Sequence, residues 1–152
     1  MKPIRVALAG AGAFGIKHLD GIQNIDGVEV VSLVSRELDK TREVAARYGI
    51  GHVTNELGDS LALPEVDAVI LCTPTQMHAA QTLECLRAGK HVQVEIPLCD
   101  VLAEGQEVVE VASKSGLVAM CGHTRRFNPS PQYVRRKLTS GAFTSQQRDV
   151  QT

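Results

Sequence analysis

One stretch near the start of the chain, V-A-L-A-G-A-G-A-F-G at residues 6–15, most constrains the fold. Small and branched apolar residues lead directly into three glycines that have the spacing G-x-G-x-x-G. At the exit of a strand, the first glycine allows a tight turn and the second lets a pyrophosphate approach the backbone. The third lets the next helix pack close to the strand, and the N-terminus of that helix attracts an anion. The stretch therefore predicts a dinucleotide site, although a plain glycine turn between a strand and a helix is the alternative. The contacts predicted here are Gly10, Gly12, Ala13, Phe14 and Gly15.

Predicted strands and helices alternate along the whole chain. Several of the strand segments are nearly continuous apolar runs, as expected of parallel strands that are covered on both faces. The expected strands are Ile4–Ala9, Val28–Val34, Ile50–Thr54, Val66–Cys72, His91–Glu95 and Leu117–Cys121. The expected helices are Phe14–Ile25, Leu38–Tyr48, Gln76–Ala88, Val101–Ser115 and Pro131–Ser140, with a helical turn inside the loop Asn55–Leu63. This alternation predicts an α/β fold of the Rossmann type, a doubly wound parallel sheet with helices on both faces and right-handed crossovers.

The last eleven residues differ from the rest. Ala142–Thr152 is polar and β-prone, but a completed doubly wound sheet leaves it no strand to pair with. We therefore expect residues 1–141 to form an NAD(P)-binding Rossmann domain and residues 142–152 to begin a C-terminal substrate or dimerisation domain that is missing here. A solvated tail is the alternative.

Composition narrows the class of protein. The 152 residues are 43% apolar and 22% charged, and the formal net charge is −1, which is typical of a soluble globular domain. This balance offers no basic surface for nucleic acid or for a membrane. The four cysteines form no C-x-x-C pair, which favours reduced thiols in a cytoplasmic protein over disulfides or a metal site. We see no signal peptide and no membrane span.

Ligands of doubly wound sheets bind beyond the carboxyl ends of the strands, so the residues that follow each strand are the informative ones. An NAD-preferring site usually carries an acidic residue at the end of the second strand, and this sequence has Ser35 and Arg36 there. A hydroxyl and a guanidinium suit the 2′-phosphate of NADP, which an acidic side chain would repel. NADP is therefore the expected cofactor, with NAD possible; the alternative for Arg36 is a solvated loop arginine.

Three later strand ends complete the predicted crevice. Cys72, Thr73 and Pro74 follow the fourth strand as a rigid turn, and we expect His78 in the next helix to face the same crevice. An ordinary surface histidine is the alternative for His78. The fifth strand ends at Glu95, whose carboxylate can accept from the hydroxyls of the nicotinamide ribose. The other cofactor contacts expected beyond this strand are Ile96 and Pro97.

The sixth strand runs into G-H-T-R-R-F-N-P, which places His123, Arg125 and Arg126 close together in sequence. Arginine forks match carboxylates, so Arg125 and Arg126 are the expected substrate contacts for a small anionic substrate. His123 is the expected proton acceptor, although a residue of the missing domain is an equally good candidate. The alternative is a charged loop that needs only solvent.

Four motifs together carry a family resemblance: G-A-G-A-F-G, C-T-P-T-Q-M-H, H-V-Q-V-E-I-P and G-H-T-R-R-F-N-P, in this order. They resemble the Gfo/Idh/MocA oxidoreductases, and they cover essentially the whole chain. The resemblance implies a two-domain NADP-dependent dehydrogenase of about twice this length that is a homo-oligomer. Members usually have E-K-P where this chain has Glu95, Ile96 and Pro97, so the catalytic lysine of many members is replaced. V-E-I-P followed by G-H-T-R-R-F-N-P is most similar to a subgroup that acts in aromatic catabolism and oxidises a cyclic hemiacetal with NADP.

Three functions follow from these residues. The first is the cofactor half of an NADP-dependent dehydrogenase, which we expect to turn over no substrate on its own. The second is a non-catalytic NADP-binding sensor or regulator, because the family includes a repressor that binds dinucleotide without turnover. The third is a stand-alone nucleotide-binding module, which the unpaired final segment disfavours.

Overall fold

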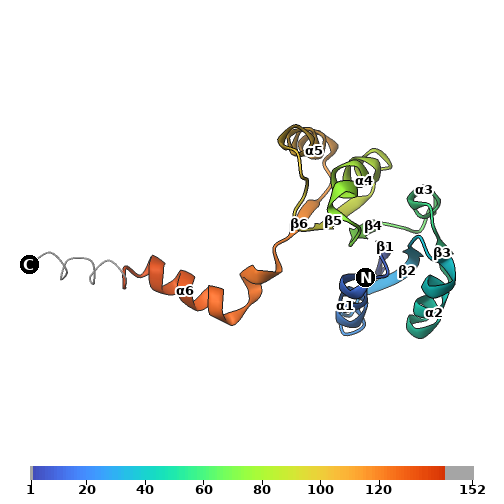
Figure 1. Cartoon of the computed structure of the whole chain (residues 1–152), viewed down its shortest axis with the longest axis horizontal. Coiled ribbons are helices and arrows are strands. Elements are labelled where there is room, and N and C mark those ends of the chain that lie inside the picture. Colours follow the sequence, from blue (N-terminus) through green and yellow to red (C-terminus); the bar gives the residue numbers. More distant parts are fainter. Residues whose placement is uncertain (1, 143–152) are drawn as a thin grey trace, which may run out of the picture. The chain divides into compact units, whose positions relative to one another are not determined.

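A computed structural model of the chain describes residues 2–142 and contains a six-stranded, wholly parallel sheet (Figure 1). The strands are β1 (Ile4–Ala9), β2 (Val28–Val34), β3 (His52–Thr54), β4 (Ala68–Leu71), β5 (His91–Glu95) and β6 (Ala119–Gly122). The helices are α1 (Ala13–Ile22), α2 (Leu38–Tyr48), α3 (Leu57–Leu61), α4 (Thr75–Arg87), α5 (Leu102–Ser115), the 3-10 helix η1 (Thr124–Phe127) and α6 (Pro129–Thr139). The strand order is β3-β2-β1-β4-β5-β6, which confirms the predicted Rossmann-type fold.

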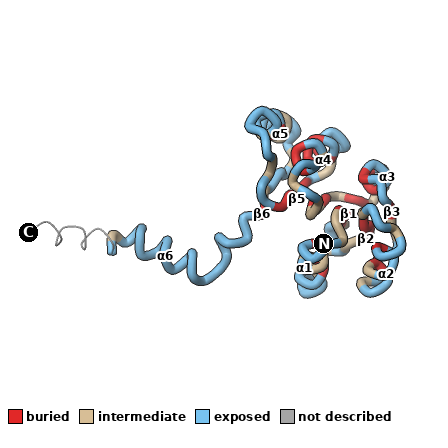
Figure 2. Tube along the Cα trace, in the orientation of Figure 1, coloured by how far each residue is buried: buried red, intermediate tan, exposed pale blue. Residues whose placement is uncertain are grey.

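Helices cover both faces of the sheet because successive strand residues point to opposite faces. On one face, Leu8 of β1 and Leu33 of β2 pack in a core with residues of α1 and α2. On the other face, Ala7 and Ala9 of β1 and Val69 of β4 join a second core with residues of α3 and α4. Figure 1 shows α1 and α2 on one side of the strands and α3, α4 and α5 on the other. In Figure 2 the buried residues gather in the strands and on the helix faces that pack against them, whereas β6 is mostly exposed.

The strand register places the predicted site residues at one edge of the sheet. Ala9 at the end of β1 is level with Val34 in β2 and Leu71 in β4, and Leu71 is level with Val94 in β5. Glu95 is level with Gly122 in β6. The order of the strands reverses between β1 and β4, and ligands of such sheets bind outside the carboxyl ends at this switch point.

Most predicted boundaries agree with the structure, and the largest difference is at the end of the first helix. That helix was expected to reach Ile25, but α1 ends at Ile22. The N–H groups of Asn24 and Ile25 bond to the carbonyls of Gly21 and Ile22, three residues back, so the chain tightens into a turn before β2. Sequence analysis also predicted no 3-10 helix at Thr124–Phe127.

The described chain divides into two compact units, one that ends at Gly122 and one that begins at His123. The first contains the whole sheet, so the compact unit around the sheet ends before residue 141. The second contains η1 and α6, and every residue from 123 to 140 is exposed, as Figure 2 shows for α6. The second domain expected from residue 142 falls almost entirely on residues outside the described part of the chain. None of the described helices has the length and apolar character needed to cross a membrane.

Candidate functional site: a hollow at the carboxyl edge of the sheet

A hollow of about 250 Å³ lies beyond the carboxyl ends of β1, β2 and β4. Its walls come from the three segments that follow these strands, from the β3–α3 loop and from α4. Seven residues predicted as cofactor contacts line it: Gly10, Gly12, Ser35, Arg36, Cys72, Thr73 and Pro74. Its other lining residues are Ala11, Val34, Asn55, Met77 and Gln81. The structure therefore brings together residues as far apart in sequence as Gly10 and Gln81.

The three glycines of the first motif have three different environments. Gly10 has φ +103°, and a Cβ there would collide with the carbonyl group of Cys72 at the end of β4. A Cβ on Gly15 would collide with the carbonyl oxygen of Gly10, so only glycine lets α1 pack this close to β1. A Cβ on Gly12 would meet no protein atom within 4 Å. Gly12 therefore faces open space, and its missing side chain leaves room for a ligand rather than for the protein.

The N-terminus of α1 opens beside this space. The first backbone hydrogen bond of the helix runs from the N–H of Ile16 to the carbonyl of Gly12, at 2.9 Å. The N–H groups of Ala13, Phe14 and Gly15 precede that bond, so the helix itself provides them with no acceptor. The first turn has no acidic residue. The positive end of the helix dipole and these N–H groups together favour an anion.

Phe14 is largely exposed, and the Nζ of Lys17 lies 5.0 Å from its ring centroid. The stacked ammonium adds one more positive charge to the first two turns of α1. Neither Phe14 nor Ala13 lines the hollow itself, so their predicted contact with a cofactor stays a prediction.

Ser35 and Arg36 follow β2 and form one wall of the hollow. The N–H of Ser35 donates to the carbonyl of Thr54 at 3.0 Å, which fixes the backbone of this turn against β3. The guanidinium of Arg36 is exposed and forms no ion pair with a described carboxylate. The nearby acidic residues are already paired, Glu37 with Lys40 at 2.6 Å and Asp39 with Arg42 at 2.9 Å. The hydrogen bond and charge of Lys40 lower the pKa of Glu37. Arg36 is therefore available for an anionic ligand.

The end of β4 adds a neutral wall. Burial, with a smaller effect of the negative charge of Glu95, raises the pKa of the Cys72 thiol to about 12, so this thiol is uncharged at neutral pH and does not repel an anion. The hydroxyl of Thr73 donates to Oε1 of Gln81 on α4 at 2.6 Å. Sequence analysis missed Gln81, because no local pattern connects it with a residue eight positions earlier.

The expectation that His78 faces the crevice is wrong. Its side chain is 2% exposed and lies beneath the loops instead of lining the hollow. Nδ1 lies 2.7 Å from the carbonyl oxygen of Pro97, and Nε2 lies 2.7 Å from the carbonyl oxygen of Thr73. His78 therefore holds two loops together, the one after β4 and the one after β5. The reason for the error is that α4 begins at Thr75, which turns its fourth residue toward the protein rather than toward the crevice.

The three residues predicted at the end of β5 and just beyond it, Glu95, Ile96 and Pro97, do not line the hollow. Glu95 is 8% exposed, and Nε2 of His18 donates to its Oε1 at 2.8 Å. Ile96 is 43% exposed, and its peptide bond to Pro97 is cis. Sequence analysis missed His18. The signal for it was present: His18 follows Gly15 by three residues and thus shares the helix face that packs on the sheet.

His123, Arg125 and Arg126 belong to the second compact unit. All three are exposed, and the N–H of Arg126 donates to the carbonyl of His123 at 3.0 Å within η1. The short helix brings them close to one another, and their predicted roles toward a substrate stay predictions.

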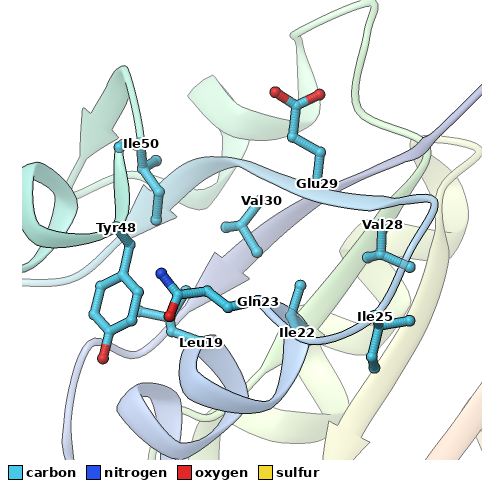
Figure 3. Close-up of a pocket in the computed structure, with 10 residues that line it drawn as sticks. Leu19, Ile22, Gln23, Ile25, Val28, Glu29, Val30, Tyr48 and Ile50 are labelled. Atoms are coloured by element: carbon cyan, nitrogen blue, oxygen red, sulfur yellow. The ribbon is translucent and has the colours of Figure 1, made fainter.

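A second hollow, of about 220 Å³, lies at the opposite edge of the sheet, where β2 begins and α1 and α2 end (Figure 3). Its lining is mostly aliphatic, with Leu19, Ile22 and Ile25 from α1 and the segment after it. Tyr48 closes α2, and its hydroxyl donates to Oδ1 of Asp20 at 2.7 Å. In Figure 3 the carboxylate of Glu29 points away from the other labelled side chains. This hollow resembles a packing gap between the ends of α1 and α2 and the start of β2, and none of its lining groups favours an anion.

Comparison with known protein families matches residues 4–123 to the Gfo/Idh/MocA oxidoreductases, described as an oxidoreductase family with an NAD-binding Rossmann fold. The 4-carboxy-2-hydroxymuconate-6-semialdehyde dehydrogenase of Sphingobium sp. (strain NBRC 103272 / SYK-6) is 59% identical over 98% of this chain and 47% of its own length. The 1,5-anhydro-D-fructose reductase of Ensifer adhaerens is 32% identical over 90% of this chain and 41% of its own. The chain thus spans about half the length of the curated relatives it matches.

Solved structures of dehydrogenases and reductases have the same fold as this chain. KijD10, a 3-ketoreductase from Actinomadura kijaniata crystallised with TDP-benzene and NADP, has a TM-score of 0.84 and 29% identity over 92% of this chain and 44% of its own. The scyllo-inositol dehydrogenase of Lactobacillus casei, crystallised with NAD(H) and scyllo-inositol, has a TM-score of 0.87 over 93% of this chain and 42% of its own. At 24% identity the second similarity concerns the fold alone.

Proposed function

The chain belongs to the Gfo/Idh/MocA family of oxidoreductases, and from this membership we propose that it is the cofactor-binding part of an NADP-dependent dehydrogenase. The observation that carries the proposal is the hollow that has open space at Gly12 on one side and the unpaired guanidinium of Arg36 on the other. NADP uses both features, because its pyrophosphate approaches a glycine backbone at a helix N-terminus while the 2′-phosphate of its adenosine ribose reaches the end of the second strand.

The residues at this edge fit such a cofactor. The N–H groups at the start of α1 would hold the pyrophosphate, and Ser35 and Arg36 would hold the adenosine ribose and its 2′-phosphate. Cys72, Thr73 and Pro74 would line the path toward the nicotinamide, and Glu95 would accept a hydrogen bond from its ribose. When bound, the oxidised nicotinamide supplies the hydride acceptor. The chain contributes binding and orientation to that chemistry.

Arg36 makes the preference for NADP testable. We expect tighter binding of NADPH than of NADH, because the guanidinium gains a charge-assisted contact with the 2′-phosphate only in NADPH. Arg36→Ala should weaken NADPH binding by about 1.5–3 kcal/mol and leave NADH binding unchanged. Arg42→Ala is the matched control, because Arg42 is an exposed arginine whose partner is Asp39 rather than a ligand.

Fluorescence titration of both cofactors against the three proteins measures this difference. Equal affinities of the original chain for NADPH and NADH would contradict the assignment of NADP. Equal losses for Arg36→Ala and Arg42→Ala would mean that Arg36 acts only through the overall charge.

For the complete protein we propose the substrate named by the relative at 59% identity, 4-carboxy-2-hydroxymuconate semialdehyde in its cyclic hemiacetal form. Oxidation to 2-pyrone-4,6-dicarboxylate would remove a hydride from the hemiacetal carbon, for which a bound nicotinamide would be the acceptor, and would release the hydroxyl proton. The ring oxygen stabilises the positive charge that develops as hydride leaves. Arg125 and Arg126 would hold the substrate carboxylates, and His123 would accept the proton.

Arg125→Ala and Arg126→Ala in the full-length protein test this substrate. At least one of them should lower kcat/KM for the dicarboxylate hemiacetal by about tenfold or more and leave a neutral sugar unaffected, because one charged contact is lost. Lys137→Ala removes a charge from α6 and serves as the control. Unchanged kcat/KM in both arginine variants would contradict the anion-binding role.

Ile96 favours a second candidate, a non-catalytic NADP-binding regulator of the same family. The resemblance places a lysine at this position in many members, and isoleucine cannot transfer a proton. Turnover distinguishes the two functions, since a regulator binds NADPH without producing it from a substrate. Absence of NADPH production by the full-length protein with the dicarboxylate hemiacetal, despite tight cofactor binding, would favour the regulator.

A further inference from the structure

Glu95 ends β5 with a carboxylate whose two oxygens have different surroundings. Nε2 of His18 donates to Oε1 at 2.8 Å, and the side-chain amide of Gln93 reaches the same oxygen at 3.4 Å. No donor in residues 2–142 bonds to Oε2. One oxygen is therefore engaged by the protein, while the other keeps its capacity to accept a hydrogen bond.

The backbone of β6 closes one side of this carboxylate. A Cβ on Gly122 would lie 2.9 Å from Oε1 and 2.7 Å from the amide nitrogen of Gln93, so glycine permits the close packing seen here. The negative charge of Glu95 also contributes to the raised pKa values of Cys72 and Cys121. The carboxylate thus lies among the ends of β4, β5 and β6, where it is largely shielded from water.

His18 reaches Glu95 from a different element. It stands on α1, three residues after Gly15, so the helix whose N-terminus faces the hollow also carries the donor to Glu95. Because a carboxylate only accepts, the contact fixes Nε2 as the protonated ring nitrogen. The side chain of His18 is 22% exposed and that of Glu95 is 11% exposed, so water competes weakly for this bond. One side chain therefore links the pyrophosphate end of the site to the end of β5.

We propose that His18 is a positioning residue that holds Oε1 of Glu95 and thereby presents Oε2 to a ribose hydroxyl in the nicotinamide half of the cofactor. This inference rests on the proposed function, because it assumes that a dinucleotide occupies the crevice. Without His18, the carboxylate loses its main fixed partner and can rotate toward water, and the hydroxyl contact loses its orientation. The adenosine half of the cofactor lies at Arg36 and does not depend on this contact.

Two probes separate the halves of the cofactor. NADPH contains the nicotinamide ribose, whereas adenosine 2′,5′-bisphosphate contains only the adenosine half with its 2′-phosphate. His18→Ala should weaken NADPH by about tenfold or more and change the affinity for the bisphosphate by less than about twofold, because one hydrogen bond to a charged group is misaligned. His18→Gln keeps an N–H donor and should recover most of the loss.

The matched control is His91→Ala. His91 is an exposed histidine at the other end of β5, where Nδ1 accepts from the N–H of Val118 at 2.9 Å. It should leave both probes unchanged. Glu95→Gln should weaken NADPH binding as much as His18→Ala does. The double variant should bind NADPH about as well as either single variant, because the two residues act through one contact.

Isothermal titration of both probes decides the question. Equal weakening of both probes by His18→Ala, or no weakening of either, would overturn the positioning role while leaving the cofactor site intact. Additive losses in the double variant would overturn it as well. Failure of the original chain to bind either probe would instead overturn the proposed function, and the role of His18 with it.

Discussion

The two hollows of the sheet have nearly the same volume, about 250 Å³ at the carboxyl edge and about 220 Å³ at the amino edge, yet the charged side chain in their lining is of opposite sign, Arg36 at the first and Glu29 at the second. The carboxyl-edge hollow is lined by glycine backbone, by hydroxyl and amide side chains, by apolar side chains such as Val34 and Met77, and by the exposed side chain of Arg36. The amino-edge hollow is lined mainly by aliphatic side chains and has one acidic residue, Glu29. Size therefore does not distinguish a ligand site from a packing gap in this fold, whereas the groups on its walls do.

The direction of the chain explains the difference. In a parallel sheet every crossover helix starts at the carboxyl edge and ends at the amino edge. The N–H groups at the start of α1 consequently face the first hollow. The second hollow lies beside the carbonyl ends of α1 and α2, at Gln23 and Gly49, where the helix dipoles are negative. An anion is attracted to one edge and repelled from the other.

The largest expected effect compares two glycines with positive φ, one at each edge. Gly10 has φ +103° and a Cβ there would collide with the Cys72 carbonyl, whereas Gly27 has φ +81° and open space around it. Gly10→Ala should lower the free energy of unfolding by about 3 kcal/mol or more, from backbone strain and overpacking together. Gly27→Ala should cost only about 1 kcal/mol, from strain alone. Urea unfolding of both variants measures the difference, and equal losses would contradict the collision expected between a Cβ at position 10 and the Cys72 carbonyl.

Much of this architecture is predictable because it depends on local patterns. The apolar runs and the turn residues between them predicted β1, β2 and β5 with their observed bounds, and the helical spacing from Leu38 to Tyr48 did the same for α2. Register in a parallel sheet then brings the strand ends to one edge, so Gly10, Ser35 and Cys72 could be grouped before the fold was known.

The next prediction concerns binding rather than stability. Gly12→Ala adds a methyl group in open space with an ordinary φ of −80°, so the free energy of unfolding should change by less than about 1 kcal/mol. The same methyl group occupies the approach to the helix N-terminus, so NADPH binding should weaken by about 2 kcal/mol. Gly21→Ala adds a methyl group in open space on the same helix, nearer the amino edge, and is the control. Equal affinities of the two variants for NADPH would contradict the claim that the cofactor approaches the backbone at Gly12.

Contacts between distant elements were less predictable. His18 and Glu95 meet only because α1 packs against the sheet, and no spacing in the sequence encodes their distance. Thr73 and Gln81 meet because the chain enters α4 at Thr75 and brings Gln81 back toward the turn before the helix. For His78, a local sequence motif gave the wrong direction of the side chain. Its place in a motif at a strand end suggested exposure, but the position at which α4 begins turned its ring into the protein, between two carbonyl groups.

Alkaline pH should also distinguish the edges. Burial, and then the charge of Glu95, raise the pKa of Cys72 to about 12 from 9.0, and the hydrogen bond to Asp20 raises the pKa of Tyr48 at the amino edge. Both folded-state pKa values are raised, so the folded chain keeps protons that the unfolded chain releases. The contribution of these two groups to the free energy of unfolding should be constant well below the unfolded thiol pKa of 9.0 and should be lost as pH rises from there toward 12. Cys72→Ala should reduce this slope by less than about 1.4 kcal/mol per pH unit, because Cys72 is partly exposed.

Urea unfolding from about pH 8 to 10 measures these slopes. Tyr48→Phe should reduce the slope less than Cys72→Ala, since the phenol is not buried. Cys85 has a pKa of about 12 in the core and provides the reference for a buried thiol. A larger effect of Tyr48→Phe would mean that the amino edge is the more shielded of the two.

The smallest expected effect is a charge change at the amino edge. Glu29 pairs with Nε of Arg5 at 3.5 Å, and the carboxylate side chain is 55% exposed, so Glu29→Gln should change the free energy of unfolding by less than about 0.5 kcal/mol. NADPH affinity should not change. The six residues of β1 separate the edges by roughly 20 Å, about twice the Debye length at 0.1 M salt, so the charge is screened before it reaches Arg36. Titration of NADPH against Glu29→Gln and Arg36→Gln, which change the net charge by one unit each, compares the edges directly. A gain for Glu29→Gln as large as the loss for Arg36→Gln would mean that net charge, and not the groups lining the carboxyl edge, determines binding.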